Sequence, residues 1–351
     1  MDQPTMPTTP PRTADRGSIW LGLLVLYVVW GSTYLGIAVA VQTIAPFLMA
    51  AARFLLAGGV LLAWSIISGR LRADAPFIPP TRRQWRDSAI VGALLLGGGM
   101  GMVAFGEQTI PSGITALLIA MMPVWVAIFG GVLLGERLPR IAVIGIVVGF
   151  VGVAILAGPT AFGETGALDP LGLAAVIVSP IAWSLGSLFA SHRATLPSQP
   201  LVATGAQMLT GGLVLTAMSA AAGEFGRFDP ASVSTASIAA FFYLAIIGSL
   251  LAFTAYGWLL RVAPLPLIAT YAYVNPVVAV ILGAWFLQEP IEPRTLIAGA
   301  VIVGAVALII TARGRMQGPG RPVRPVVAPT RASTDATALG SASASTVDGS
   351  R

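Results

Sequence analysis

The stretch GITALLIAMMPVWVAIFGGVLL, residues 113–134, lies in a part of the chain that carries no charged residue between Glu107 and Glu136. A helix that crosses the hydrocarbon core of a bilayer needs about 20 mostly apolar residues. This stretch is long enough and apolar enough to do so. It therefore predicts a membrane-spanning helix, with Pro123 inside it.

Nine further stretches have the same character. Hydrophobic residues make up 56% of the 351 residues and charged residues 10%, whereas soluble domains have about 45–50% and about 25%. An ordinary soluble domain is excluded. The sequence predicts an all-α integral membrane protein with ten transmembrane helices, the other nine at residues 19–41, 46–67, 88–105, 141–157, 170–190, 201–221, 237–260, 266–287 and 296–311.

The residue types exclude several kinds of chemistry. All 20 basic residues are arginine, and the chain has no cysteine and one histidine, His192. A phosphate-binding P-loop and a Schiff base both need lysine, and thiolate chemistry needs cysteine. The predicted spans contain no aspartate, cysteine or internal histidine. We therefore expect no catalytic residue, no metal and no cofactor, and we do not expect an enzyme or a nucleic-acid partner.

The arginines indicate the orientation of the chain. Short cytoplasmic loops of membrane proteins carry the excess of basic residues, and with ten spans both termini lie on one side. The expected cytoplasmic parts are an N-terminal segment, residues 1–17, and a disordered tail, residues 313–351; residues 158–169 form an extracytoplasmic loop. The arginines assigned to the cytoplasmic side are Arg12, Arg16, Arg70, Arg72, Arg82, Arg83, Arg86, Arg137, Arg140, Arg193, Arg261 and those from Arg313 onward.

The two halves of the chain repeat at a nearly constant offset. Five spans per half is an odd number, so the second copy enters the membrane from the opposite side, as in many secondary transporters with a site near the midplane. The sequence predicts inverted repeats at residues 18–157 and 170–312. The matched pairs are Trp30 and Trp183, Pro46 and Pro200, Gly58 and Gly212, Pro123 and Pro276, Glu136 and Glu289, and Gly145 and Gly299.

Several short motifs together resemble one transporter family. They are Trp30-Gly31-Ser32-Thr33, Arg53-Phe54 after Pro46, Gly135-Glu136-Arg137-Leu138 after the Pro123 segment, and Leu287-Gln288-Glu289-Pro290 after the Pro276 segment. In these motifs the chain resembles the EamA family of the drug/metabolite transporter superfamily. The resemblance implies a ten-helix carrier in the inner membrane that exports small metabolites such as amino acids or drug-like compounds.

Five residues are candidates for solute binding. Arg53 lies about 10 Å into its helix if each residue after Pro46 rises about 1.5 Å. A charge at that depth must face protein or water, so Arg53 either contacts solute or a gate, or binds helix-end carbonyls. The other four are polar or aromatic residues at mid-depth, either as repeat equivalents or on one face of a helix: Trp30, Trp183, Tyr271 and Asn275.

Three residues are candidates for conformational change. Pro123 and Pro276 each remove a backbone hydrogen bond inside a span and kink it, unless they serve only packing. Glu107, the acid nearest the membrane on the outer side, either pairs with Arg53 or is a solvated loop residue. We expect Glu289 to form an ion pair with Arg294.

These features favour a secondary transporter that exports a small organic solute by alternating access. Its expected partners are that solute and membrane lipids, and the small-residue pair Gly145 and Gly149 suits either packing within the chain or a homodimer. The expected location is a bacterial inner membrane. The alternatives are an integral-membrane enzyme, and a receptor or channel without transport activity.

Overall fold

The structure is a computed structural model that describes residues 16–71, 76–136, 138–162, 168–263, 265–268 and 270–316. Most of the predicted N-terminal segment and tail, the middle of the predicted loop after the first repeat, and Arg137 lie outside the described residues. The expectations for those parts stay predictions.

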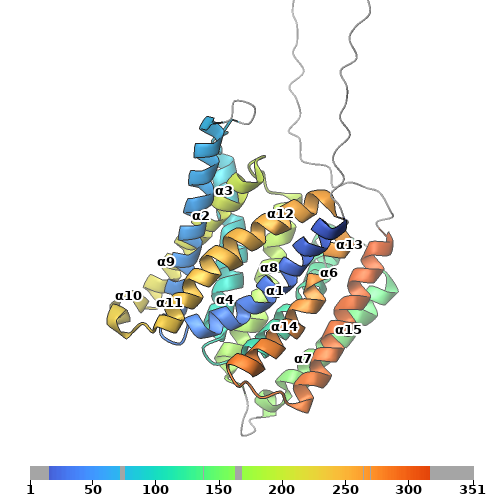
Figure 1. Ribbon diagram of the computed structural model, residues 1–351. Coiled ribbons are helices and arrows are strands. Elements are labelled where there is room, and N and C mark those ends of the chain that lie inside the picture. Colours follow the sequence, from blue (N-terminus) through green and yellow to red (C-terminus); the bar gives the residue numbers. More distant parts are fainter. Residues whose placement is uncertain are drawn as a thin grey trace, which may run out of the picture. The chain divides into compact units, whose positions relative to one another are not determined.

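The described elements are all helical, and the described residues contain no strand (Figure 1). Eight helical segments are long and apolar enough to cross a membrane, and two apolar helices, Arg140–Leu156 and Tyr271–Phe286, are shorter. The helices are α1 Arg16–Ala40, α2 Pro46–Leu71, α3 Arg82–Gly92, η1 Ala93–Gly101, α4 Met102–Gly106, α5 Ser112–Ile119, α6 Met122–Leu134, α7 Arg140–Phe162, α8 Pro170–His192, α9 Pro200–Ala221, α10 Glu224–Arg227, η2 Pro230–Ser232, α11 Thr235–Phe242, η3 Tyr243–Leu251, α12 Ala252–Val262, α13 Leu265–Ile268, α14 Tyr271–Phe286 and α15 Pro293–Met316.

Four predicted spans are less regular than a continuous α-helix. The third span contains the π-helical segment η1, and the eighth contains the π-helical segment η3. The fourth span is two helices, α5 and α6, and the ninth is divided into α13 and α14. Irregular backbone inside a membrane protein is tolerated where it is buried in protein or lines a cavity.

The prediction that Pro123 kinks the interior of one helix is wrong in detail. Pro123 lies in the first turn of α6, where proline suits the helix because the missing N–H has no intrahelical acceptor. The interruption lies just before it, at Ala120 and Met121. Pro276 does lie inside a helix, α14, as the sequence predicts.

Close helix packing depends on small residues. A Cβ atom added to Gly58 in α2 would lie 2.8 Å from the backbone nitrogen of Leu209 in α9. A Cβ added to Gly145 in α7 would lie 3.0 Å from the carbonyl oxygen of Ala305 in α15. The small residues therefore let α2 approach α9 and α7 approach α15, so Gly145 serves packing within the chain.

Two glutamates cap the N-termini of helices that are distant in sequence. The carboxylate of Glu289 accepts hydrogen bonds from the backbone amides of Ser112, at 2.7 Å, and Gly113, at 3.1 Å. The carboxylate of Glu224 accepts from the first amides of α2. The expected pair of Glu289 with Arg294 is wrong, since Arg294 binds Glu292 at 3.1 Å. The first amides of α5 lack intrahelical acceptors, and their positive partial charge attracts a carboxylate.

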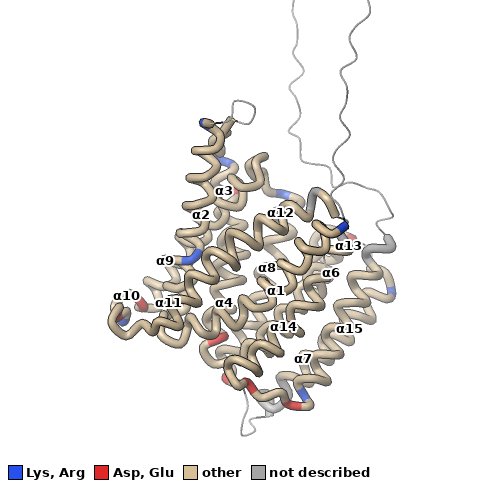
Figure 2. Tube along the Cα trace, viewed as in Figure 1, with Lys and Arg blue, Asp and Glu red and all other residues tan. Residues whose placement is uncertain are grey.

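Apart from Arg53 inside α2, the charged residues of the described helices and connections lie towards the two ends of the helix bundle (Figure 2). We call one the arginine-rich end. It carries seven arginines at the start of α1, α3 and α7 and the end of α2 and α8, together with the acids Asp87 and Glu136; the arginines are Arg16, Arg70, Arg82, Arg83, Arg86, Arg140 and Arg193. We call the other the acidic end; it carries Glu107, Asp169, Glu224, Asp229, Glu289 and Glu292, with Arg227 and Arg294.

The α2–α9 contact predicts different outcomes for two neighbouring glycines. Gly58→Ala should lower the free energy of unfolding by about 1–3 kcal/mol, because the new methyl group meets backbone atoms that cannot move aside. Gly59 has nothing within 4 Å of its added Cβ, so Gly59→Ala should stabilise by up to about 1 kcal/mol. The free energy of unfolding of each variant can be measured with purified protein in detergent. Equal changes in Gly58→Ala and Gly59→Ala would contradict the close approach of α2 and α9 at Gly58.

The Glu289 cap predicts a second asymmetry. Glu289→Ala should destabilise the protein by about 1.5–3 kcal/mol, because charge-assisted hydrogen bonds to two amides are lost. Glu292→Ala, at an exposed acid of the same connection, should change stability by less than about 0.5 kcal/mol. The same unfolding measurement checks this, and an equal loss in both variants would mean that the cap contributes nothing specific.

Candidate functional site

A cavity of about 470 Å³ lies inside the bundle. Each of the four irregular spans contributes to its wall. Helices α1, α2, α4, α8, α9 and α12 also contribute lining residues. From the irregular spans come Leu95 and Met100 of η1, Ile119, Ala120 and Met122 at the junction of α5 and α6, Gly248 of η3, and Tyr271 and Ala272 at the start of α14.

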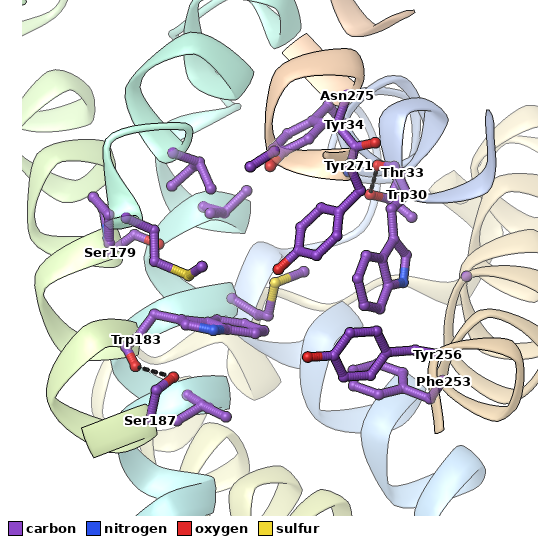
Figure 3. A pocket seen from close by; sticks show the side chains of 18 of the residues that line it. Trp30, Thr33, Tyr34, Ser179, Trp183, Ser187, Phe253, Tyr256, Tyr271 and Asn275 are labelled. Carbon is purple, nitrogen blue, oxygen red and sulfur yellow. Dashed lines mark hydrogen bonds between the residues drawn. The ribbon is translucent and has the colours of Figure 1, made fainter. Parts of the chain in front are cut away.

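Aromatic rings form one wall of the cavity. The ring centroid of Trp30 lies 5.0 Å from that of Tyr271, 5.3 Å from Tyr256 and 5.7 Å from Phe253. Figure 3 shows the hydroxyl groups of Tyr256 and Tyr271 directed towards Trp183, which comes from α8 on the opposite side. Rings with outward hydroxyl groups offer a solute both apolar contact and hydrogen bonds.

Arg53 brings a permanent charge into this cavity. Its side chain is 3% exposed, its Nε donates a hydrogen bond to the Ser249 hydroxyl at 3.0 Å, and its guanidinium carbon lies 4.9 Å from the centroid of the Phe54 ring. The Ser249 hydroxyl in turn donates to the carbonyl of Leu244 at 3.0 Å. No described residue accepts a hydrogen bond from the two terminal nitrogens of Arg53. These free donors match a carboxylate.

Glu107 is buried but does not line the cavity. The residue is 6% exposed, and neither carboxylate oxygen has a hydrogen-bond partner among the described residues. Burial raises the pKa of the Glu107 carboxyl well above its usual range, and nearby Glu289 acts in the same direction, while Arg53 lowers it. Arg53 and Glu107 thus interact electrostatically without forming the direct ion pair that the sequence suggested.

The cavity extends towards one end of the bundle only. Its lining includes Pro200, Ala203 and Thr204 in the first turns of α9, at the arginine-rich end. Towards the acidic end, the lining on α2 stops at Arg53, about two turns inside that helix. A packed apolar layer bounds the cavity on this side, and one of its members, Val103, also lines the cavity. The layer is made by Ile37, Ala40, Val41, Met49, Val103, Ala104 and Leu244. Packed side chains of α1, α2, α4 and η3 therefore separate the cavity from the acidic end on this side.

The structure gathers most of the predicted residues around this cavity. All five solute-binding candidates and both prolines line it, namely Trp30, Arg53, Trp183, Tyr271, Asn275, Pro123 and Pro276; Glu107 alone does not. Sequence reasoning missed several polar residues, because a lone Ser, Thr or Gln in an apolar helix gives no signal of its direction: Thr33, Ser179, Ser187, Thr204 and Gln207. Among the described residues, no three His, Asp or Glu side chains come together as metal ligands would.

Comparison with known proteins points to one family. Residues 17–158 and, separately, 170–311 match the EamA-like transporter family. An uncharacterized inner membrane transporter of Escherichia coli, YedA, is 37% identical over 309 residues, which cover 88% of this chain and 94% of that protein. The protein PecM of Dickeya dadantii is 26% identical over 283 residues, 80% of this chain and 88% of PecM.

A solved crystal structure shares the fold. It superposes with a TM-score of 0.56 at 21% identity and covers 87% of this chain and 100% of the other. At that identity the likeness concerns the fold alone.

Proposed function

Because the chain belongs to the EamA-like transporter family, we propose that it exports a small organic solute, such as an amino acid or a drug-like compound, by alternating access. Membrane transport and a multi-pass location in an inner membrane follow from the family, the YedA relative and the apolar helices. The direction, the solute class and the mechanism are the proposal.

One observation carries this proposal: the central cavity combines an aromatic wall with the free donors of a buried arginine. Pockets for small organic ligands are mostly apolar, with a few well-placed polar groups. The cavity has that composition, and it reaches one end of the bundle while a packed apolar layer bounds it towards the other. A central cavity that is accessible from one side of the membrane is expected for one conformation of an alternating-access carrier.

The arrangement of the helices supports two inverted repeats of five spans. The eight long spans and two shorter apolar helices would make ten. In each half the third span carries a π-helical segment, η1 or η3, and the fourth is interrupted. The first half begins at the arginine-rich end and the second at the acidic end, and each half matches the family separately.

The charge distribution supports an orientation. Basic residues favour the cytoplasmic side, so we assign the arginine-rich end and both termini to the cytoplasm. In this orientation the cavity is open inward, towards the solute to be exported. The acidic end would have to open for release.

Counterflow in liposomes tests the function. Purified protein would be reconstituted and loaded with an unlabelled amino acid or its carboxamide, and uptake of the same labelled compound would be followed. Transient accumulation of at least one compound, absent from protein-free vesicles, is expected. Its absence across a panel of amino acids, their carboxamides and drug-like amines would contradict the proposal.

Arg53 predicts a preference for carboxylates. Arg53→Gln should weaken binding of an amino acid about 10- to 100-fold, because a charged hydrogen bond contributes about 1.5–3 kcal/mol. The matching carboxamide, which lacks the carboxylate, should lose much less. Counterflow as a function of concentration measures both.

A structural role for Arg53 would give a different result. In that case expression and thermal stability would fall, and both compounds would be affected alike. Arg53→Lys is the matched control, since it keeps the charge but loses the planar fork of donors; it should retain more of the preference than Arg53→Gln.

Pro276 predicts an effect on turnover. Pro276→Ala would allow a backbone hydrogen bond within α14, and about 0.5–1.5 kcal/mol of added stability in one conformation would slow exchange about two- to tenfold. Pro293→Ala is the control, because Pro293 is the first residue of α15 and its missing N–H has no intrahelical acceptor in any case. Equal exchange rates in wild type and Pro276→Ala would leave this proline a packing residue.

A further inference from the structure

The carboxyl group of Glu107 has no use in the site described so far. It directly follows α4, at 6% exposure, and its two oxygens have no hydrogen-bond partner among the described residues. An ionised carboxylate without partners in an apolar environment is strongly unfavourable, so such a group takes up a proton or pairs with a cation. Glu107 therefore needs an explanation that packing does not give.

The groups around Glu107 leave it without a direct partner. Both oxygens of Glu289 are occupied by the amides of α5, and Asp169 accepts from Thr109 and Gly172. Arg53 is not within ion-pair distance but acts on Glu107 electrostatically. The ionisable groups on the elements packed around it are Tyr34 on α1, Arg53 on α2, Tyr243 on η3, Asp169 before α8, and Glu289 after α14.

Arg53 connects Glu107 with the cavity. Arg53 lines the cavity, and its two terminal nitrogens have no hydrogen-bond partner among the described residues. Its helix α2 packs against α4, the helix that Glu107 directly follows, with Met49 and Val103 in one apolar cluster. From there its positive charge favours the ionised form of Glu107. A solute carboxylate bound there would neutralise the guanidinium. The influence that favours ionised Glu107 would then be removed, and the affinity of Glu107 for a proton would rise. Binding linkage is reciprocal, so a proton on Glu107 would raise the affinity for the carboxylate by the same factor.

We infer that Glu107 is a proton-binding site, and that a solute carboxylate on Arg53 and a proton on Glu107 bind together. The proton comes from water and converts the carboxylate of Glu107 to the acid. A solute that carries one net negative charge would then cross with a proton as a neutral pair. This inference rests on the proposed function, because it takes the cavity as the solute site.

A proton fits Glu107 better than a metal cation does. A hard cation needs several oxygen ligands, and Glu107 is not part of any cluster of three or more His, Asp or Glu among the described residues. A proton needs one carboxylate oxygen.

The test compares three proteins in detergent: wild type, Glu107→Gln and Glu292→Gln. The binding constant of the amino acid that gives the strongest counterflow is measured from pH 5.5 to pH 8.5, with sodium and with choline as the buffer cation. In wild type and Glu292→Gln the affinity should fall as pH rises, on the order of tenfold. Glu107→Gln, which resembles the protonated state, should bind with the low-pH affinity at every pH.

Three results would overturn the inference. They are a wild-type affinity that does not change with pH, a pH dependence that survives in Glu107→Gln, and an affinity that requires sodium. Glu107→Asp is the control for misfolding, because it changes the same position but keeps a titratable carboxyl group. Its solute affinity should still depend on pH, whereas that of Glu107→Gln should not.

Infrared spectroscopy without solute separates this inference from the proposed function. At pH 5.5, the carbonyl band of a protonated buried carboxyl should be present in wild type and Glu292→Gln and missing in Glu107→Gln. An identical band in all three proteins would overturn the proton site even if counterflow is robust. Conversely, the band could be lost only in Glu107→Gln while the wild-type protein shows no counterflow. That result would contradict the proposed function but support the proton site.

Discussion

The structure depends on one constraint: inside a bilayer, every backbone N–H and C=O must find its partner within the protein. Regular helices satisfy it, and the described part of the chain consists of them. Within the described parts of the predicted spans, the α-helix is replaced or interrupted at four places: the π-helical segments η1 and η3 and the breaks before α6 and α14. All four spans contribute residues to the central cavity at or beside these places. The backbone thus departs from the regular α-helix where it faces other helices or the cavity. Elsewhere in proteins, π-helical turns inside α-helices frequently occur at functional sites.

Arg53 and the acidic end give this scaffold its chemistry. Burying a guanidinium requires local partners, and η3 supplies one through Ser249, whose own hydroxyl is held by Leu244. In the proposed function, the side of the guanidinium without described partners binds the solute. Towards the acidic end lie a packed apolar layer and the carboxylates of Glu224 and Glu289, which cap the N-termini of α2 and α5. Arg53 therefore lies between the proposed solute cavity and the apolar layer. In the proposed function, the helices that form this layer would have to separate before the solute could leave at the acidic end.

The sequence predicted an all-helical membrane protein and many of the residues that line the cavity. Apolar length and a charge at mid-depth are local signals, so they can be read without knowledge of the packing. Arg53 was found from its charge at mid-depth, and Trp183 from its repeat equivalence with Trp30. The sequence did not predict η1, the interruption at Ala120 or the partner of Glu289, since each depends on a neighbour far along the chain. Pro123 shows the limit: proline signals an irregular backbone, but whether it kinks a helix or begins one is decided by the packing around it.

The central claim is that solute passes through the cavity that opens at α9. The chain has no cysteine, so Thr204→Cys can be labelled alone with a bulky, membrane-impermeant maleimide, with Gly226→Cys on α10, outside the cavity lining, as control. The account predicts that labelling at position 204 abolishes counterflow, that excess solute slows the labelling, and that labelling at position 226 does neither. Full labelling at position 204 with undiminished counterflow would contradict it.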